Sequence, residues 1–313
     1  MAAQAEARAR TNFLVVGLNP TLQNTFTVPS LRVSQVNRVL DHRVDVAGKG
    51  GNTTRVLTQL GERAVHLTFG GGRTLDLYRE LCRRDGINLR CVECNVDIRF
   101  CHTLVGEHDR TTTEIVEPGH VVSPAVEEAI ITGFDDELAH AHTVIIGGSK
   151  APGFSDDLYA RLVQKAAAAG VRSVLDIRGK DLLGCLVHRP SAIKINVSEF
   201  SHTFTPGTPL DEDVLPEAIP ASLFDRMIQL TTETGAELVL TNGSQPVLLV
   251  ADGAVKTMIP PRVEPVNVVG CGDAATAGLA AGLHHGKAIE EAVRLALDCA
   301  AKNAALLAPG SIR

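Results

Sequence analysis

The stretch that decides the fold is Val266-Asn-Val-Val-Gly-Cys-Gly-Asp-Ala-Ala-Thr-Ala-Gly278, in which a glycine-flanked turn leads directly into an alanine-rich helix. A turn of this kind directs several backbone N–H groups at one point, at the positive end of a helix dipole. The arrangement suits a phosphoryl group. Asp273 lies just inside the turn, where a carboxylate beside bound phosphate can accept a proton from an attacking hydroxyl.

Two other interpretations fit parts of this stretch. Gly270 and Gly272 can simply shape a loop, with Asp273 as an acid that the helix dipole favours in its first turn. The spacing Gly270-x-Gly272-x-x-Ala275 also matches a dinucleotide-binding fingerprint. That fingerprint opens a strand–helix–strand unit, whereas here a second helix follows the first and Pro265 interrupts the approach, so we exclude it.

Short apolar runs alternate with helical patterns along most of the chain. The strand-like runs are residues 13–17, 65–69, 144–146, 173–175, 192–194, 238–240 and 247–250. Apolar residues at helical spacing occur at 52–60, 75–85, 155–169 and 223–234, and then in two successive helices at 273–284 and 288–307. Runs that are apolar throughout are typical of strands buried on both faces. The alternation predicts an α/β protein with a doubly wound, mostly parallel sheet.

Amphipathic strands fall outside this rhythm at 26–46, 98–105 and 111–116, the last two forming a hairpin around a polar turn. We expect them to form a small β-sheet lid over the carboxyl ends of the main strands, where open α/β sheets bind ligands. The predicted organisation is one α/β domain over residues 1–313, with lid strands inserted at about 24–46 and 92–117. Residues 1–10 are interpreted as a disordered tail.

Composition narrows the classes of function. The 313 residues are 44% apolar and 21% charged, which is typical of a globular protein. The net charge of −6 provides no basic surplus for a nucleic-acid partner. No apolar run reaches the ~20 residues needed to cross a bilayer, so we expect no membrane association. Seven cysteines at irregular spacing favour a reducing compartment, and the predicted location is cytoplasmic.

A second glycine-rich segment, Ala47-Gly-Lys-Gly-Gly-Asn52, runs into a predicted helix. Its glycines let the backbone approach a ligand, while Lys49 offers a point charge and Asn52 an amide. The segment is not a P-loop, because no Gly-Lys-Ser/Thr follows a four-residue gap.

The two segments together resemble a known family. Gly48-Lys-Gly-Gly-Asn52 and Gly270-Cys-Gly-Asp273 are similar to the two signatures of the ribokinase-like (PfkB) carbohydrate kinases. Asn19-Pro-Thr-Leu22 and Val36-Asn-Arg38 more narrowly resemble the 1-phosphofructokinase and tagatose-6-phosphate kinase branch, as does the stretch 266–273. The similarity continues in chain order through residues 148–153, 194–199, 241–243 and 308–310.

The resemblance implies a ribokinase-like fold and transfer of the γ-phosphate of ATP, with Mg²⁺, to a hydroxyl of a phosphorylated ketohexose. The acceptor would be of the fructose-1-phosphate, fructose-6-phosphate or tagatose-6-phosphate type. Asp273 would be the base, and the N–H groups of Gly270, Cys271 and Gly272 the anion hole.

The resemblance also implies the binding residues. Those for the acceptor are Gln23, Arg38, Gly48, Lys49, Asn52, Arg99 and Ser149. Those for the nucleotide are Lys194, Asn196, Thr241, Gly243 and Asn303. Asn196 and Glu199 would hold Mg²⁺ through water.

Departures from the branch leave the acceptor open. Gln23 stands where an aspartate is usual, and an amide both donates and accepts hydrogen bonds. Lys150 and Arg178 add cations near the ends of predicted strands, either for a second phosphate or for solvent. The alternatives are a kinase for an unphosphorylated sugar, polyol or nucleoside, and a non-catalytic regulatory protein that binds a sugar phosphate. Retention of Asp273, Asn196 and Glu199 together argues against the second.

Two further expectations concern assembly and reactivity. One small lid sheet cannot bury its own apolar face and open edges, so we expect a homodimer formed through the lid. Cys271 begins the helix behind the anion hole, where the dipole can lower the pKa of a thiol and make it reactive. The alternative is an inert cysteine that fills space.

Overall fold

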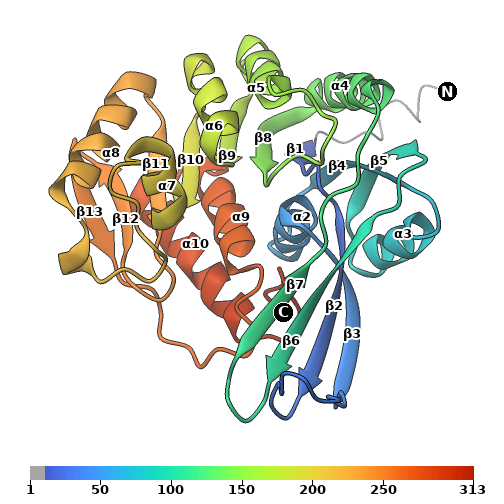
Figure 1. Cartoon of the computed structure of the whole chain (residues 1–313). Helices are drawn as coiled ribbons and strands as arrows, with labels where there is room; N and C mark the ends of the chain where they lie inside the picture. Colours follow the sequence, from blue (N-terminus) through green and yellow to red (C-terminus); the bar gives the residue numbers. More distant parts are fainter. Residues whose placement is uncertain (1–10) are drawn as a thin grey trace.

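A computed structural model describes residues 11–313 of the chain (Figure 1). The tail expected at residues 1–10 lies outside the described residues. The main sheet has nine strands in the order β13-β12-β11-β10-β9-β8-β1-β4-β5. Pairing is parallel from β11 to β5 and antiparallel for β12 and β13, which confirms the predicted mostly parallel sheet. These strands are β1 (Thr11–Val16), β4 (Ala64–Gly71), β5 (Asn88–Cys94), β8 (Ala141–Gly147), β9 (Arg172–Asp176), β10 (Ala192–Asn196), β11 (Glu237–Thr241), β12 (Val247–Ala251) and β13 (Ala254–Met258).

Helices cover both faces of this sheet, as the doubly wound prediction requires. Alternate side chains of β1 point to opposite faces: Leu14 and Val16 join one apolar cluster, and Phe13 and Val15 join another. The first cluster includes α4 (Pro124–Leu138), α5 (Leu158–Ala168), α6 (Gly179–Cys185), α7 (Val197–Phe204) and α8 (Ala221–Thr234). The opposite face packs against α2 (Lys49–Gln59), α9 (Cys271–His284) and α10 (Ile289–Ala304).

A second sheet forms the lid, with strand order β3-β2-β6-β7 (Figure 1). Its strands are β2 (Thr21–Val28), β3 (Asp41–Ala47), β6 (Arg99–Gly106) and β7 (Thr112–Val116). The predicted β6–β7 hairpin is confirmed. The predicted lid boundaries need correction, because residues 92–94 belong to β5 of the main sheet and the first lid strand begins at Thr21. The stretch 26–46 is likewise two strands joined by a loop.

The base of the lid rests on α3 (Leu75–Arg84), which shares an apolar cluster with Leu22 and Val46. In the part of the chain that the structure describes, no helix combines the length and the apolar character needed to span a membrane.

Close approach of glycines places the start of α2 beside the end of β1. A Cβ added at Gly17 would lie 2.8 Å from Gly50 Cα, and one at Gly50 would lie 2.5 Å from His66 Cε1. Only glycine fits at this crossing. Further along α2, Val56 and Leu57 join Ala274 and Ala277 of α9 in one cluster. The two glycine-rich segments of the sequence therefore meet in space.

Candidate active site

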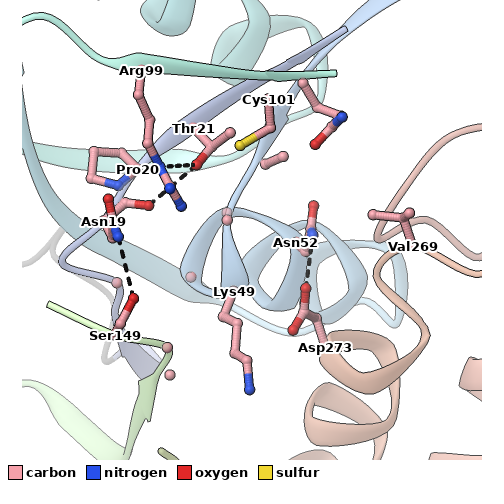
Figure 2. Close-up of a pocket in the computed structure, with 18 of the residues that line it drawn as sticks. Asn19, Pro20, Thr21, Lys49, Asn52, Arg99, Cys101, Ser149, Val269 and Asp273 are labelled. Carbon is pink, nitrogen blue, oxygen red and sulfur yellow. Dashed lines mark hydrogen bonds between the residues drawn. The ribbon is translucent and has the colours of Figure 1, made fainter. Parts of the chain in front are cut away.

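A cavity of about 290 Å³ opens between the lid and the carboxyl ends of β1 and β8. Its wall contains residues from the glycine loop before α2, from β2, β6 and β7, and from α9 (Figure 2). Of the residues expected to bind an acceptor, those that line it are Gln23, Gly48, Lys49, Asn52, Arg99 and Ser149. Arg38 does not line the cavity. It is exposed on the loop between β2 and β3, so this chain does not bring it to its own site.

Asp273 lies in the first turn of α9 and faces the cavity with only 8% of its surface exposed. Asn52 Nδ2 donates a hydrogen bond to Asp273 Oδ2 at 2.8 Å (Figure 2). Burial raises the pKa of Asp273 above its ordinary value, and the charge of Lys49 acts in the opposite direction. A carboxylate with a raised pKa beside a ligand cavity is suited to accept a proton.

The turn before α9 begins at Gly270, whose φ of 86° is in the left-handed region that favours glycine. Cys271 N–H donates to Val268 O at 3.2 Å. Gly270 and Gly272 come too early in the helix for their N–H groups to bond within it. These two amides, at the positive end of α9, are therefore better placed than Cys271 to bind an anion, which narrows the predicted set of three donors.

Asp176, at the end of β9, is a site residue that the sequence did not reveal. It is 1% exposed and accepts hydrogen bonds from Lys49 Nζ at 2.5 Å, Lys194 Nζ at 3.2 Å and Thr276 Oγ1 at 2.6 Å. Burial alone would raise the pKa of Asp176, but the two lysines and these hydrogen bonds lower it to about 2. In return, the carboxylates around Lys49 raise the pKa of its ammonium above its ordinary value.

Asn196 and Glu199 form a capping box at the start of α7. Glu199 N–H donates to Asn196 Oδ1 at 2.6 Å, and Asn196 N–H donates to Glu199 Oε2 at 3.2 Å. The second oxygen of Glu199 lies 3.9 Å from both Lys49 Nζ and Arg178. Carboxylate and amide oxygens are ligands that Mg²⁺ accepts, directly or through water. The side chains present therefore fit a water-bridged Mg²⁺.

The expected nucleotide residues lie along the neighbouring strand ends. Asn196 pairs with Thr241 across β10 and β11, and Gly243 follows with a φ of 54°. Lys194 Nζ also donates to Gly272 O at 3.0 Å, which ties β10 to the turn of α9.

Asn303 is fully buried beneath the turn before α9. Its amide donates to Val269 O at 3.0 Å, and its oxygen accepts from Ser311 N–H at 3.0 Å. The side chain faces these backbone groups and holds the turn against the last residues of the chain.

Cys271 is also mostly buried, and burial raises the pKa of its thiol to about 11. The expectation of a reactive thiol with a lowered pKa is therefore wrong. Desolvation of the thiolate outweighs both the hydrogen bond from Asn303 and the nearby charge of Lys194, and Asp273 disfavours a thiolate as well.

The lid side of the cavity carries a cation, an anion and a neutral amide. Arg99 donates to Thr21 Oγ1 at 3.1 Å (Figure 2). It also donates to the backbone carbonyl of Glu117. Gln23 is 3% exposed and donates to Thr103 Oγ1 at 2.8 Å. Glu114 of β7 also lines the cavity, and partial burial together with the charge of Asp273 raises its pKa.

The two extra cations noted in the sequence differ in their environment. Lys150 Nζ is bonded to Asp181 at 2.5 Å and lies over the Tyr159 ring, so the protein itself satisfies its charge. Arg178 is 72% exposed beside Glu199. Only Arg178 remains open to a ligand.

These features define a class. A doubly wound sheet whose strand ends carry lysines and a buried carboxylate, with a glycine turn at a helix N-terminus and a β lid, is the architecture of a small-molecule kinase. Residues 15–307 match the family described as pfkB family carbohydrate kinase. The chain belongs to this family of phosphotransferases, whose acceptor is a sugar hydroxyl.

Solved structures agree with the fold. A mutant of phosphofructokinase-2 from Escherichia coli has a TM-score of 0.84 at 21% identity and covers 96% of each chain. The same enzyme in complex with substrates and products has a TM-score of 0.84 at 21% identity, covering 94% of this chain and 93% of the other. A Thermotoga maritima protein described as a "possible 1-phosphofructokinase" has a TM-score of 0.81 at 20% identity, covering 95% and 92%.

Proposed function

We propose that the protein transfers the γ-phosphate of ATP to a hydroxyl of a phosphorylated ketohexose, with Mg²⁺ and with Asp273 as the base. The observation that carries this proposal is the pair formed by Asn52 and Asp273 inside a cavity that Arg99 and Lys49 also line. A base, an oriented amide and two cations are what a sugar phosphate needs at the moment of transfer.

In this proposal Asp273 accepts the proton of the acceptor hydroxyl as that oxygen attacks the γ-phosphorus of ATP. The bond between this phosphorus and the bridging oxygen breaks, and ADP leaves with its electron pair. The N–H groups of Gly270 and Gly272 then stabilise negative charge on the transferred phosphoryl group. Lys49 and Lys194, which are held by Asp176, contribute positive charge near the transferred phosphoryl group. Mg²⁺, when bound, neutralises charge on the phosphate oxygens.

Residues of the nucleotide side complete the proposed site. Lys194, Asn196, Thr241 and Gly243 bind the nucleotide at the ends of β10 and β11, and Glu199 orders water around the metal. For Asn303 we propose a positioning role instead, because its side chain holds the turn of the anion site from below.

One observation favours a second candidate, a kinase for an unphosphorylated sugar or polyol. Glu114 places a carboxylate in the acceptor cavity, where it repels a phosphate and accepts hydrogen bonds from hydroxyls. Gln23, bonded to Thr103, provides no positive charge for a phosphate. Arg99 is the group that offsets Glu114 in the first proposal.

A coupled assay of ADP release over ketohexose phosphates, free sugars, polyols and nucleosides, with MgATP, distinguishes these candidates. We expect the highest kcat/KM with a ketohexose phosphate. A higher value with a free sugar or polyol would favour the second candidate. Binding of sugar phosphates without ADP release from any acceptor would contradict both and support a regulatory protein.

We also propose a homodimer formed through the lid. Strands β3 and β7 are the edges of the lid sheet, and Ile115 and Val116 on β7 are 58% and 57% exposed. Pairing with a second copy covers such an edge. Light scattering at micromolar concentration should give twice the monomer mass, and a monomer mass would contradict the proposal.

A further inference from the structure

Arg55, in the second turn of α2, is 4% exposed and uses its guanidinium entirely within the protein. Nε donates to Asp85 Oδ2 at 2.8 Å, and Nη2 donates to Val46 O. Nη1 donates to Asn52 Oδ1 at 3.3 Å, to Pro309 O at 2.9 Å and to Gly310 O at 3.2 Å. One side chain therefore joins segments that are distant in sequence.

Each of these segments shapes the active site. Val46 is near the end of lid strand β3, directly before the glycine loop that enters α2. Gly310 packs beneath the turn before α9, since a Cβ added at Gly270 would lie 2.3 Å from Gly310 N. A Cβ added at Gly310 would in turn lie 2.3 Å from Asn52 Cβ. These contacts leave no room for a side chain at Gly270 or Gly310.

The bond to Asn52 has a particular consequence. An amide side chain presents an oxygen on one side and an NH₂ group on the other, so it can face Asp273 in either of two orientations. A guanidinium has only donors. Because Arg55 donates to Asn52 Oδ1, the NH₂ group of Asn52 must point at Asp273. The opposite orientation would place an oxygen against the carboxylate and two donors against each other.

We propose that Arg55 is a positioning residue that fixes the amide of Asn52 so that it donates to Asp273. This inference rests on the proposed role of Asp273 as the base. Arg55 touches neither the acceptor nor the phosphate. It acts through Asn52, which orients the carboxylate toward the acceptor hydroxyl.

A series of alternating charges holds Arg55 in place from outside. Asp85 accepts from Arg55 and also from Arg84 Nε at 2.7 Å. Arg84 Nη2 donates to Asp45 Oδ1 at 2.8 Å, and Arg43 Nε donates to Asp45 Oδ2 at 2.6 Å. The series runs from lid strand β3 across the end of α3 to α2. Arg55 therefore links the lid to Asn52 and, through it, to Asp273.

The role predicts a change in pH dependence. The Asn52 donor lowers the pKa of Asp273, against the dominant effect of burial. Loss of that donor leaves burial opposed only by the lysines, so the pKa rises further and the acid limb of kcat moves to higher pH. The charged groups that face Asp273 are Lys49, Lys194, Asp176 and Glu114. None of them is changed by a substitution of Arg55.

The first test is the kcat–pH profile of Arg55→Lys, with Arg161→Gln as the matched control. Arg161 pairs with Glu127, and neither residue lines the catalytic cavity. We expect Arg55→Lys to lower kcat roughly tenfold, the equivalent of one hydrogen bond to a charged group, and to shift the acid limb upward. The KM for ATP should stay close to that of the wild type. Arg161→Gln should keep the wild-type profile.

The second test is chemical rescue. A cavity of about 390 Å³ opens beside Arg55, Asp85 and Ser311, and can admit a free guanidinium ion. Millimolar guanidinium should restore part of the kcat of Arg55→Ala in a saturable way, whereas equal concentrations of NaCl or urea should not. Should Arg55→Ala fail to fold, the profile of Arg55→Lys decides alone.

Failure of this inference differs from failure of the proposed function. If Asp273→Asn is inactive but a folded Arg55→Lys keeps the wild-type acid limb, Arg55 does not position the base and the inference is overturned. If Asp273→Asn turns over like the wild type, Asp273 is not the base and the proposed function fails as well.

Discussion

Two buried carboxylates lie at the candidate site, Asp176 at the end of β9 and Asp273 in the first turn of α9. Asp176 is held by Lys49, Lys194 and Thr276, which lower its pKa to about 2. Asp273 has the amide of Asn52 as its bonded side-chain donor, and burial raises its pKa. The residue type is the same, but the surroundings differ in how much positive charge they place within bonding distance.

If Asp273 is the base, as proposed, the difference separates a carboxylate that anchors lysines from one that reacts. Ionised Asp176 stabilises the fold, because its charge is compensated where it is buried. Asp273 is buried without full compensation of its charge, so its protonated form is favoured in the folded protein. The stability that this raised pKa contributes is present below the unfolded pKa and is lost as pH rises through the folded pKa. A reactive group held at a cost to stability is common at catalytic sites.

The largest expected effect is on catalysis at α9. Asp273→Asn should lower kcat by about 10²–10⁴, the contribution of general base catalysis, while ATP affinity stays nearly intact. Because the substitution removes an uncompensated buried charge, the melting temperature at pH 7 should equal or exceed that of the wild type. Steady-state kinetics, calorimetry with ATP and thermal unfolding measure the three quantities. Turnover of Asp273→Asn at the wild-type rate would show that Asp273 is not the base.

Substitution of Asp176, at the end of β9, should instead lower the stability of the protein. Asp176→Asn leaves Lys49 and Lys194 without their shared partner, and breaking a buried pair in this way typically costs about 3–5 kcal/mol. Urea unfolding at pH 7 measures this loss.

The sign of the pH dependence provides a further check on Asp176. Its lowered pKa contributes stability above the unfolded value of about 3.9, and this contribution is lost as pH falls toward 2. The difference between wild type and Asp176→Asn should therefore shrink between pH 5 and the lowest pH at which both still fold. A constant difference over that range would mean that Asp176 is not the stabilising carboxylate.

The comparison also explains what the sequence could predict. Asp273 was found because its signal is local: two glycines, a helix start and an acid within four residues, 270–273. Asp176 was missed because two of its partners, Lys49 and Thr276, lie 127 and 100 positions away, and only the fold brings them together. A polar residue that directly follows a buried strand was the one signal available for it.

The same reasoning applies to the elements of the fold. The inner strands were predicted because burial on both faces requires continuous apolar runs. The edge strands β5 and β13 were missed, because none of their residues is fully buried and their sequences mix charged and apolar residues. Helix α4 was missed as well. The second lid boundary was misplaced because the mixed sequence of β5 resembles that of a lid strand.

A smaller effect should separate the two cations of the cavity. Figure 2 shows the Lys49 side chain pointing away from Arg99, and Asp176 holds its ammonium on the side of the anion turn. Lys49→Gln should therefore lower kcat/KM for phosphorylated and free sugars alike. Arg99→Gln should raise KM ten- to a hundredfold for the phosphorylated sugar only, since a charged contact to phosphate contributes roughly 1.5–3 kcal/mol.

The control for this pair is the ratio of kcat/KM for a phosphosugar to that for the matching free sugar. It should change in Arg99→Gln and stay constant in Lys49→Gln. If both variants change it equally, both cations bind the acceptor phosphate. In that case Lys49 must leave Asp176 when substrate binds, and the two carboxylates differ less than their hydrogen bonds indicate.

The smallest effect concerns Cys271, which shares its surroundings with Asp273. Burial that raises the pKa of a carboxyl group must also raise that of a neighbouring thiol, and here the thiol reaches about 11. Against a free thiol with a pKa near 8.5, the thiolate fraction at pH 8 is lower by roughly two orders of magnitude. Iodoacetamide should accordingly alkylate Cys271 about a hundred times more slowly than N-acetylcysteine in the same buffer, and activity should persist over that time. Mass spectrometry of peptides sampled between pH 7 and 9 measures the rate, which should rise about tenfold per pH unit across the whole interval. A rate that levels off near pH 7 would reveal a thiolate stabilised by the helix, and the dipole would then outweigh desolvation at Cys271.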